Sequence, residues 1–191
     1  MNLNFYEDIE QCINVLRSGG TILYPTDTIW GIGCDATNEN AVRRVYEIKQ
    51  RADSKSLILL AYSPYQIANY VEEIPQIAYD LIEIADKPLT IIYPNAKNLA
   101  KSVIADDGSV GFRVPKDDFC RQLCEKFSRP IVSSSANISG ERSPACFNEI
   151  SETIKKSVDY IVNFKQDDTN HSLPSSIIKL KGNAEFQIIR K

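Results

Sequence analysis

Apolar residues recur at helical spacing in several stretches of the chain. Near its start, Ile9, Cys12, Ile13 and Leu16 fall on one face of a helix, and a Gly-Gly pair at 19–20 ends the pattern. Each such stretch has one apolar face to bury against a core. The same spacing predicts further helices at 38–48, 64–71, 75–85, 117–128 and 147–156.

Short apolar runs bounded by turn residues predict buried strands between these helices. The last two runs are separated only by Lys181-Gly182-Asn183, which predicts a hairpin and therefore an antiparallel pair. Because strands and helices otherwise alternate, the pattern favours a mixed sheet with helices packed on it. The predicted strands lie at 21–25, 57–61, 89–93, 110–114, 130–134, 158–163, 175–180 and 185–190.

Size and charge narrow the class of protein. The 191 residues are expected to form a single domain, 1–191, with a sizeable core. A net charge of -3 gives no overall basic field for nucleic acid, although a local basic cleft stays compatible with it. The start, MNLNFYEDIEQ, lacks the features of a secretory signal, and no apolar run reaches the roughly 20 residues that span a bilayer. A cytoplasmic protein with no membrane partner is therefore expected.

Several common catalytic patterns are absent. The chain contains neither GxxxxGK[ST] nor GxGxxG, the two familiar glycine loops for nucleotides, and no GxSxG. Of its five cysteines, Cys120 and Cys124 share a helical face, but no CxxC pair occurs and the single histidine, His171, lies far away in a polar stretch. The cysteines are therefore expected to be buried thiols. Catalysis, if any, would rest on positioning and fixed charge.

A dense run of small polar residues follows a strand end in IVSSSANISGERSP, 131–144. Two interpretations of this serine segment are about equally open. Its side chains could satisfy their own turn, or they could bind a ligand at the carboxyl end of a strand, where open α/β sheets take small molecules. The polar residues are Ser133, Ser134, Ser135, Asn137, Ser139, Arg142 and Ser143.

Cations are concentrated at two other places. Lys49, Arg51 and Lys55 extend from a predicted helix end towards the strand at 57–61. Complementing the helix dipole would explain Lys49 alone, whereas the three together would suit a polyphosphate. Arg113 lies inside the apolar strand VGFRV, where it either points to solvent or clamps a carboxylate.

Four segments, taken together and in this order, closely resemble the YrdC family: YPTDTIWGIGCDA, KQRADSKSLILL, VGFRVP and PIVSSSANISG. The resemblance runs from about Gly20 to Arg190. Alone, YPTDT could be an Asx-type turn after proline, and neither the KxR…K arm nor the SxN element is specific. The combination of these three elements with a lone arginine inside a strand is specific to the family.

The resemblance implies a three-layer α/β fold of the α+β type, with helices on both faces of a twisted mixed parallel and antiparallel sheet and a concave, positively charged cleft. It also implies a nucleotidyltransferase. Single-domain relatives make threonylcarbamoyl-AMP and pyrophosphate from L-threonine, bicarbonate or CO2, and ATP, with Mg²⁺ accompanying the ATP. A tRNA threonylcarbamoyl transferase complex then moves the threonylcarbamoyl group to adenosine in tRNA, so tRNA would be an indirect partner.

The resemblance also implies roles for individual residues. Thr26 and Arg113 would hold threonine, with Arg113 taking its carboxylate, and Ser133 and Ser175 would contact the same substrate. No protein ligand for a metal is implied. The residues implied for catalysis are Lys49, Arg51 and Lys55, and those implied for ATP are Lys49, Arg51, Ser135, Asn137, Ser143 and Arg190.

The chain departs from the family pattern at three places. Ala52 stands where a proline often follows KxR, Asp86-Lys87-Pro88 replaces a Pro-Gly-Pro, and Trp30 replaces a Tyr or Phe. A diverged YrdC paralogue with related acyl-adenylate chemistry is therefore one alternative. The others are an RNA-binding module that uses the basic cleft and a relative that forms carbamoyl-adenylate from carbamoyl phosphate.

Overall fold

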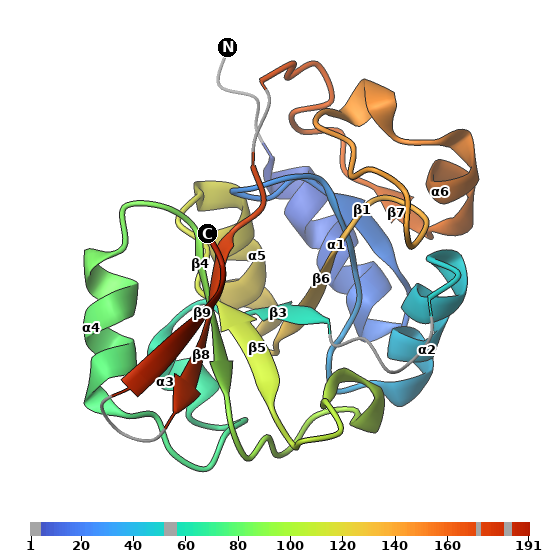
Figure 1. The fold of residues 1–191 in the computed structure, drawn as a ribbon. Helices are drawn as coiled ribbons and strands as arrows, with labels where there is room; N and C mark the ends of the chain where they lie inside the picture. The colour runs from blue at the N-terminus through green and yellow to red at the C-terminus, as the bar shows by residue number, and fades with distance from the viewer. Residues whose placement is uncertain (1–4, 52–56, 171–172, 182–184) are drawn as a thin grey trace.

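The strands of the computed structural model, which describes residues 5–51, 57–170, 173–181 and 185–191, join in one mixed sheet (Figure 1). They are β1 (Ile22–Tyr24), β2 (Gly31–Gly33), β3 (Ile58–Leu60), β4 (Leu89–Tyr93), β5 (Val110–Arg113), β6 (Ile131–Ser135), β7 (Tyr160–Ile161), β8 (Ser176–Lys181) and β9 (Glu185–Arg190). Their order across the sheet is β7-β1-β2-β6-β3-β5-β4-β8-β9.

The sheet combines parallel and antiparallel pairs, as the sequence predicts. The pairs β1–β7, β3–β5 and β4–β8 are parallel, and the other neighbours are antiparallel. The predicted antiparallel pairing of the last two strands is confirmed in β8 and β9. Most of the hairpin predicted at 181–183 lies outside the described residues.

The helices follow the predicted positions with two differences. The stretch 147–156 is broken into a 3-10 turn and a short helix, and the stretch 64–71 forms only one helical turn. The helices are α1 (Tyr6–Arg17), α2 (Glu39–Ile48), α3 (Pro64–Ile67), α4 (Gln76–Ile84), α5 (Asp118–Phe127) and α6 (Glu152–Ser157), with 3-10 turns η1 (Lys101–Val103) and η2 (Phe147–Glu149). None of these is long and apolar enough to cross a bilayer.

The ends of α5 show how the local sequence determines where a helix begins and stops. The Asp117 side chain accepts a hydrogen bond from the backbone N–H of Cys120 at 2.9 Å, which caps the first turn. At the other end Ser128 adopts φ 63°, a left-handed conformation that stops the helix. Between these ends the predicted inward residues Phe119, Leu123 and Phe127 are all buried.

Helices cover both faces of the sheet. Neighbouring residues of a strand point to opposite faces, and in β5 the ring of Phe112 meets that of Tyr70, which follows α3, at 6.3 Å. The next residue, Arg113, turns to the other face, where its charge acts on the thiol of Cys120 in α5. Cys120 itself is fully buried, as predicted for the cysteines, although Cys146 is only half-buried. The three-layer arrangement of the predicted fold class is thus observed.

The strand β2 has no counterpart among the predicted strands. Gly31-Ile32-Gly33 forms the strand between β1 and β6. Its backbone is closely packed, since a Cβ at Gly33 would lie 2.6 Å from the ring of Tyr24 and 2.9 Å from the carbonyl oxygen of Val132. Strand propensity misses such a segment because only one of its three residues favours a strand.

Candidate active site

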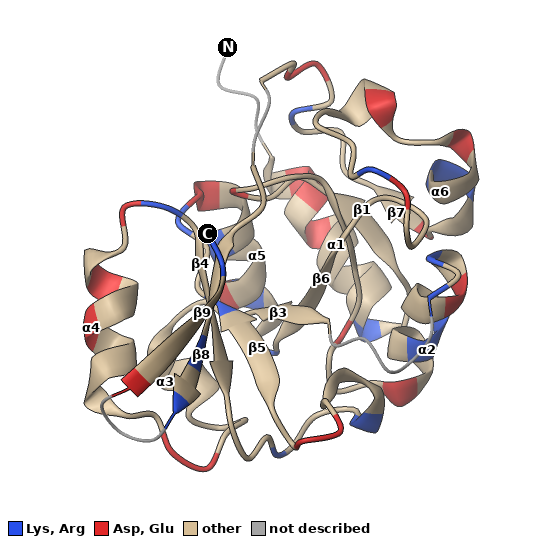
Figure 2. Ribbon diagram, viewed as in Figure 1, with Lys and Arg blue, Asp and Glu red and all other residues tan. Residues whose placement is uncertain are grey.

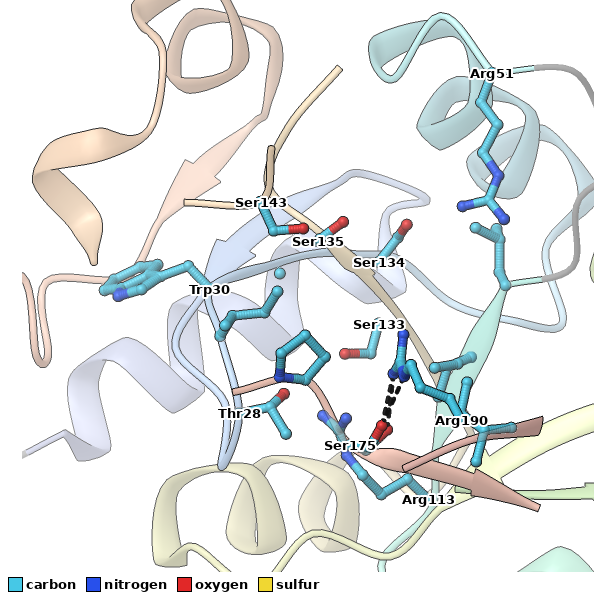
Figure 3. A pocket seen from close by; sticks show the side chains of 16 residues that line it. Thr28, Trp30, Arg51, Arg113, Ser133, Ser134, Ser135, Ser143, Ser175 and Arg190 are labelled. Carbon is cyan, nitrogen blue, oxygen red and sulfur yellow. Dashed lines mark hydrogen bonds between the residues drawn. The ribbon is translucent and has the colours of Figure 1, made fainter. Parts of the chain in front are cut away.

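A cavity of about 250 Å³ lies on the face of the sheet to which Arg113 points (Figure 3). Strand register explains why residues far apart in sequence meet there. Ser133 pairs with Ile58, and Arg113 pairs with Leu60 two residues further along the same strand, so both side chains leave the same face. Seven residues implied by the resemblance line the cavity: Arg51, Arg113, Ser133, Ser135, Ser143, Ser175 and Arg190.

Arg113 forms part of the cavity wall and is held from behind. Its side chain is only 4% exposed, so the interpretation that it points to solvent is wrong. The Nη2 atom lies 3.1 Å from Oδ1 of Asp27 and donates to the hydroxyl of Thr26 at 3.4 Å. A guanidinium fixed on one side in this way can offer its remaining N–H groups to an anion in the cavity.

Arg190 approaches the same end of the cavity from β9. Its Nε and Nη2 donate to the backbone carbonyl of Ser175 at 2.9 and 2.7 Å, as Figure 3 shows. The Ser175 hydroxyl in turn lies 2.8 Å from that of Thr90. Burial, together with the nearby charge of Arg113, lowers the pKa of Arg190. Two guanidinium groups brought this close favour an anion between them.

Arg51 reaches the cavity from the chain that follows α2 and, in the view of Figure 3, lies across it from Arg113. Burial lowers its pKa as well. The serines of β6 lie between these arginines in that view. The cavity therefore has a cationic group at each end and hydroxyls along the middle, an arrangement that suits an elongated molecule with more than one negative charge.

Lys49 is not among the residues that line the cavity. Its side chain is almost fully buried, and its amine donates to the backbone carbonyls of Ser135 and of Asn137, the latter at 2.8 Å. Burial, and secondarily the charge of Arg51, lowers the pKa of this amine to about 8. Lys49 thus ties the end of α2 to the serine segment. The third predicted cation, Lys55, lies outside the described residues.

The serine segment is divided between residues that satisfy their own turn and residues that line the cavity. The Asn137 amide donates to the carbonyls of Ile138 and Glu141 at 2.8 and 3.0 Å, so this side chain satisfies its own turn. It does not line the cavity, although the Ser143 hydroxyl lies 3.5 Å from its Oδ1. The serines on the cavity wall are Ser133, Ser134, Ser135 and Ser143.

Some cavity residues were missed from sequence alone. Thr28, not Thr26, lies on the wall, and the two hydroxyls are 2.8 Å apart. The segment that holds both threonines forms a bend in which the Thr28 N–H donates to the Thr26 hydroxyl at 3.0 Å, so no strand alternation distinguished the two threonines in advance. Trp30 also lines the cavity, packed 4.8 Å from the ring of Phe147, and its place in the family pattern marked it only as a variation. The other missed wall residues include Pro174 and Ile177.

The described residues of the cavity wall offer no metal site of their own. No carboxylate is present among the described residues that line the cavity. In the described part of the chain, no group of three or more His, Cys, Asp or Glu side chains comes together to hold a metal ion. Hard cations such as Mg²⁺ prefer carboxylate and other oxygen ligands. The donors present fit phosphates and carboxylates far better than they fit a bare cation.

Comparison with known proteins identifies the family. The Sua5/YciO/YrdC family model, described as "Telomere recombination", matches residues 14–191. The threonylcarbamoyl-AMP synthase of Psychromonas ingrahamii is 34% identical over 151 residues, which are 78% of this chain and 79% of the relative. Two structures of P. abyssi Sua5 are also similar, both at 28% identity: a variant with a TM-score of 0.86 and a complex with L-threonine with a TM-score of 0.81.

This chain is shorter than the two Sua5 chains. The matches cover 96% and 91% of this chain but 56% and 51% of theirs, so it spans about half their length. The resemblance read from the four sequence segments and the expected fold are both confirmed by these matches. Since the family model spans nearly all of the sequence, the chain belongs to the Sua5/YciO/YrdC family.

Proposed function

We propose that this protein is a threonylcarbamoyl-AMP synthase, an adenylate-forming nucleotidyltransferase that uses L-threonine, bicarbonate or CO2, and ATP. The observation that carries the proposal is the convergence of Arg51, Arg113 and Arg190 on one serine-lined cavity that has no carboxylate among its described residues. Such a cavity suits a reaction between two anions, which repel each other unless fixed cations lie between them. The names of similar proteins agree with this choice.

The reaction needs no nucleophile from the protein. The threonine amine adds to CO2 and loses a proton, giving a carbamate. A carbamate oxygen then attacks the α-phosphorus of ATP, a P–O bond forms, and the bond to the pyrophosphate leaving group breaks. Holding the two reactants in line is the main contribution of the site.

Each cation has a place in this scheme. Arg113 receives the threonine carboxylate, for which the planar guanidinium is suited. Arg51 lies towards the polyphosphate, and Arg190 lies between the two substrates. Lys49 holds the serine segment in place through the carbonyls of Ser135 and Asn137. Mg²⁺ would arrive with ATP and stay on its phosphates and water, because the described residues of the cavity wall include no carboxylate for it.

The product would feed tRNA modification, so we place the reaction in the cytoplasm. Threonylcarbamoyl-AMP is a mixed anhydride, and a separate transferase complex would consume it. A diverged paralogue that adenylates another carbamate would share the fold and the arginines, and it differs in the amino acid it requires. The choice of amine substrate is therefore the property to measure.

The test is pyrophosphate release in the presence of ATP and Mg²⁺, with each substrate omitted in turn. We expect release only when L-threonine and bicarbonate are both present, because only their carbamate can attack ATP. L-Serine, which lacks the methyl group of threonine, and L-valine, which has a methyl group in place of the hydroxyl, are the matched controls. Equal release without threonine would refute the proposal, and a stronger response to another amino acid would favour the diverged paralogue.

A further inference from the structure

Buried polar atoms without a hydrogen-bond partner gather behind the arginine end of the cavity. Within the described residues, they include both carboxylate oxygens of Asp27, the Nε of Arg113 and the Oδ2 of Asp117. Folded proteins leave few such atoms, and a cluster of them calls for an explanation. The unpartnered donor here belongs to the arginine that lines the cavity, and the same arginine forms an ion pair with Asp27.

The contact between Asp27 and Arg113 is an ion pair that lacks hydrogen-bond alignment. The two side chains are 7% and 4% exposed, and Oδ1 lies 3.1 Å from Nη2. The same Nη2 donates to Thr26, so both contacts act on one corner of the guanidinium. Its Nε is left unpartnered and buried.

The charges around Asp27 indicate that its carboxylate acts as the counter-ion of Arg113. Burial raises the pKa of its carboxyl, Arg113 opposes that shift, and the carboxylate of Asp117 adds to it. A buried guanidinium is costly without a counter-ion, and removing one member of such a pair leaves the other uncompensated. Asp27 lies on the loop between β1 and β2 and outside the cavity wall, so it can act on substrate only through Arg113.

We propose that Asp27 is a positioning residue whose buried carboxylate holds the Arg113 guanidinium in the orientation that receives the carboxylate of threonine. This inference rests on the proposed function, since it takes threonine as the ligand of Arg113. Asp27 does not touch substrate. It fixes one corner of the guanidinium and thereby directs the remaining donors into the cavity.

The test is direct binding of L-threonine, followed by the fluorescence of Trp30, the single tryptophan of the chain and a wall residue of the cavity, with calorimetry as a second readout. We expect Asp27→Asn to raise the Kd for threonine about tenfold and to change the Kd for ATP less than twofold, because a charged hydrogen-bond partner is misplaced. Asp35→Asn is the matched control. It removes a buried carboxylate that pairs with Arg129 at 2.8 Å outside the cavity.

A double-mutant cycle separates positioning from a general structural effect. In an Arg113→Lys background, Asp27→Asn should add little further loss of threonine binding, because the group through which it acts is already changed. Full additivity of the two losses would overturn the proposal, as would wild-type threonine binding by Asp27→Asn. Equal weakening of ATP and threonine binding would overturn it too.

Two further outcomes also have a defined meaning: a variant that does not fold, and a wild-type protein that does not bind threonine. If Asp27→Asn does not fold, Asp27→Glu replaces it, since this variant keeps the charge and displaces the carboxylate by one methylene. A threonine Kd at least about threefold above wild type supports positioning, and an unchanged Kd overturns it. If the wild-type protein itself does not bind threonine, the proposed function fails first, and this result is distinct from a failure of Asp27 alone.

Discussion

Arg113 differs from Arg190 in how it is held. Arg190 donates to the backbone carbonyl of Ser175 and, at 3.4 Å, to its hydroxyl, whereas Arg113 is held by the side chains of Asp27 and Thr26. Side-chain contacts orient the guanidinium plane, and a bidentate grip on a carboxylate depends on that plane. The identity of residue 113 should therefore affect one substrate far more than the other.

We predict that Arg113→Lys raises the threonine concentration needed for half-maximal rate at least about tenfold and leaves ATP affinity nearly unchanged. Lysine keeps the charge but cannot reproduce the guanidinium fork. Steady-state titration of each substrate measures the effect. Arg129→Lys, a change at an arginine paired with Asp35 outside the cavity, is the control. Damaged ATP binding with normal threonine binding would reverse the assignment.

At the scale of elements, Lys49 links the end of α2 to the serine segment at the end of β6. Its amine donates to two backbone carbonyls of the serine segment and is buried beside it. The pKa of this amine is lowered from its ordinary value of 10.5 to about 8. The cationic form is therefore present below about pH 8 and is lost as the pH rises through that value.

We predict that turnover falls as the pH rises above about 8 and that this alkaline limb is absent in Lys49→Met, whose turnover is low throughout. The unfolded chain keeps the lysine proton up to about pH 10.5, so it binds more protons than the folded chain between these two values. Stability therefore rises with pH over this range, because the penalty for burying the charged amine is removed as the amine loses its proton. The enzyme should thus lose rate without melting. Rate profiles from about pH 6.5 to 9.5 with parallel melting curves measure both quantities.

An exposed lysine gives the control for this profile. Lys101→Met in η1 removes a surface charge and should keep the wild-type limb. An unchanged limb in Lys49→Met would contradict the assignment of the pKa to this residue. A limb that coincides with thermal unfolding would contradict it as well.

The sequence predicts those elements in which apolar residues recur at the spacing of a helix or a strand. Apolar spacing locates α1, α2 and α5, because each buries one face. It fails at β2, where two glycines provide no strand signal, and at 147–156, where the predicted helix is interrupted.

The cavity is only partly predictable for a similar reason. Family motifs point to Arg113, but its pairing with Asp27, 86 positions earlier, depends on the register of the folded sheet.

At the scale of the whole molecule, positive charge is local rather than general. The net charge is -3. Figure 2 shows acidic and basic residues mixed over the outer helices, and α4 carries acidic residues with no lysine or arginine. The arginines of the cavity lie within the fold instead of forming a basic stripe. An extended polyanion would meet acidic as well as basic residues on such a mixed surface, whereas a small anion can enter the cavity.

The RNA-binding alternative therefore makes a distinct prediction about salt. A protein that binds RNA through many phosphates loses affinity steeply with salt, by about 10³–10⁵ between 50 and 200 mM for six to ten contacts. A nucleotide held by the few arginines of the cavity should lose much less. We expect ATP binding to weaken less than about tenfold over this range, and tRNA to bind weakly at 50 mM without displacing ATP.

Fluorescence titration with ATP and a filter or mobility assay with tRNA, both at the two salt concentrations, test this expectation. Arg51→Ala should weaken ATP binding and leave any residual tRNA binding unchanged, because surface contacts would carry the latter. Tight tRNA binding that competes with ATP and disappears in Arg51→Ala would instead make the cavity part of an RNA surface. Catalysis within the cavity and recognition of tRNA would then be functions of the same residues, and the proposed division between this enzyme and a separate transferase would be wrong.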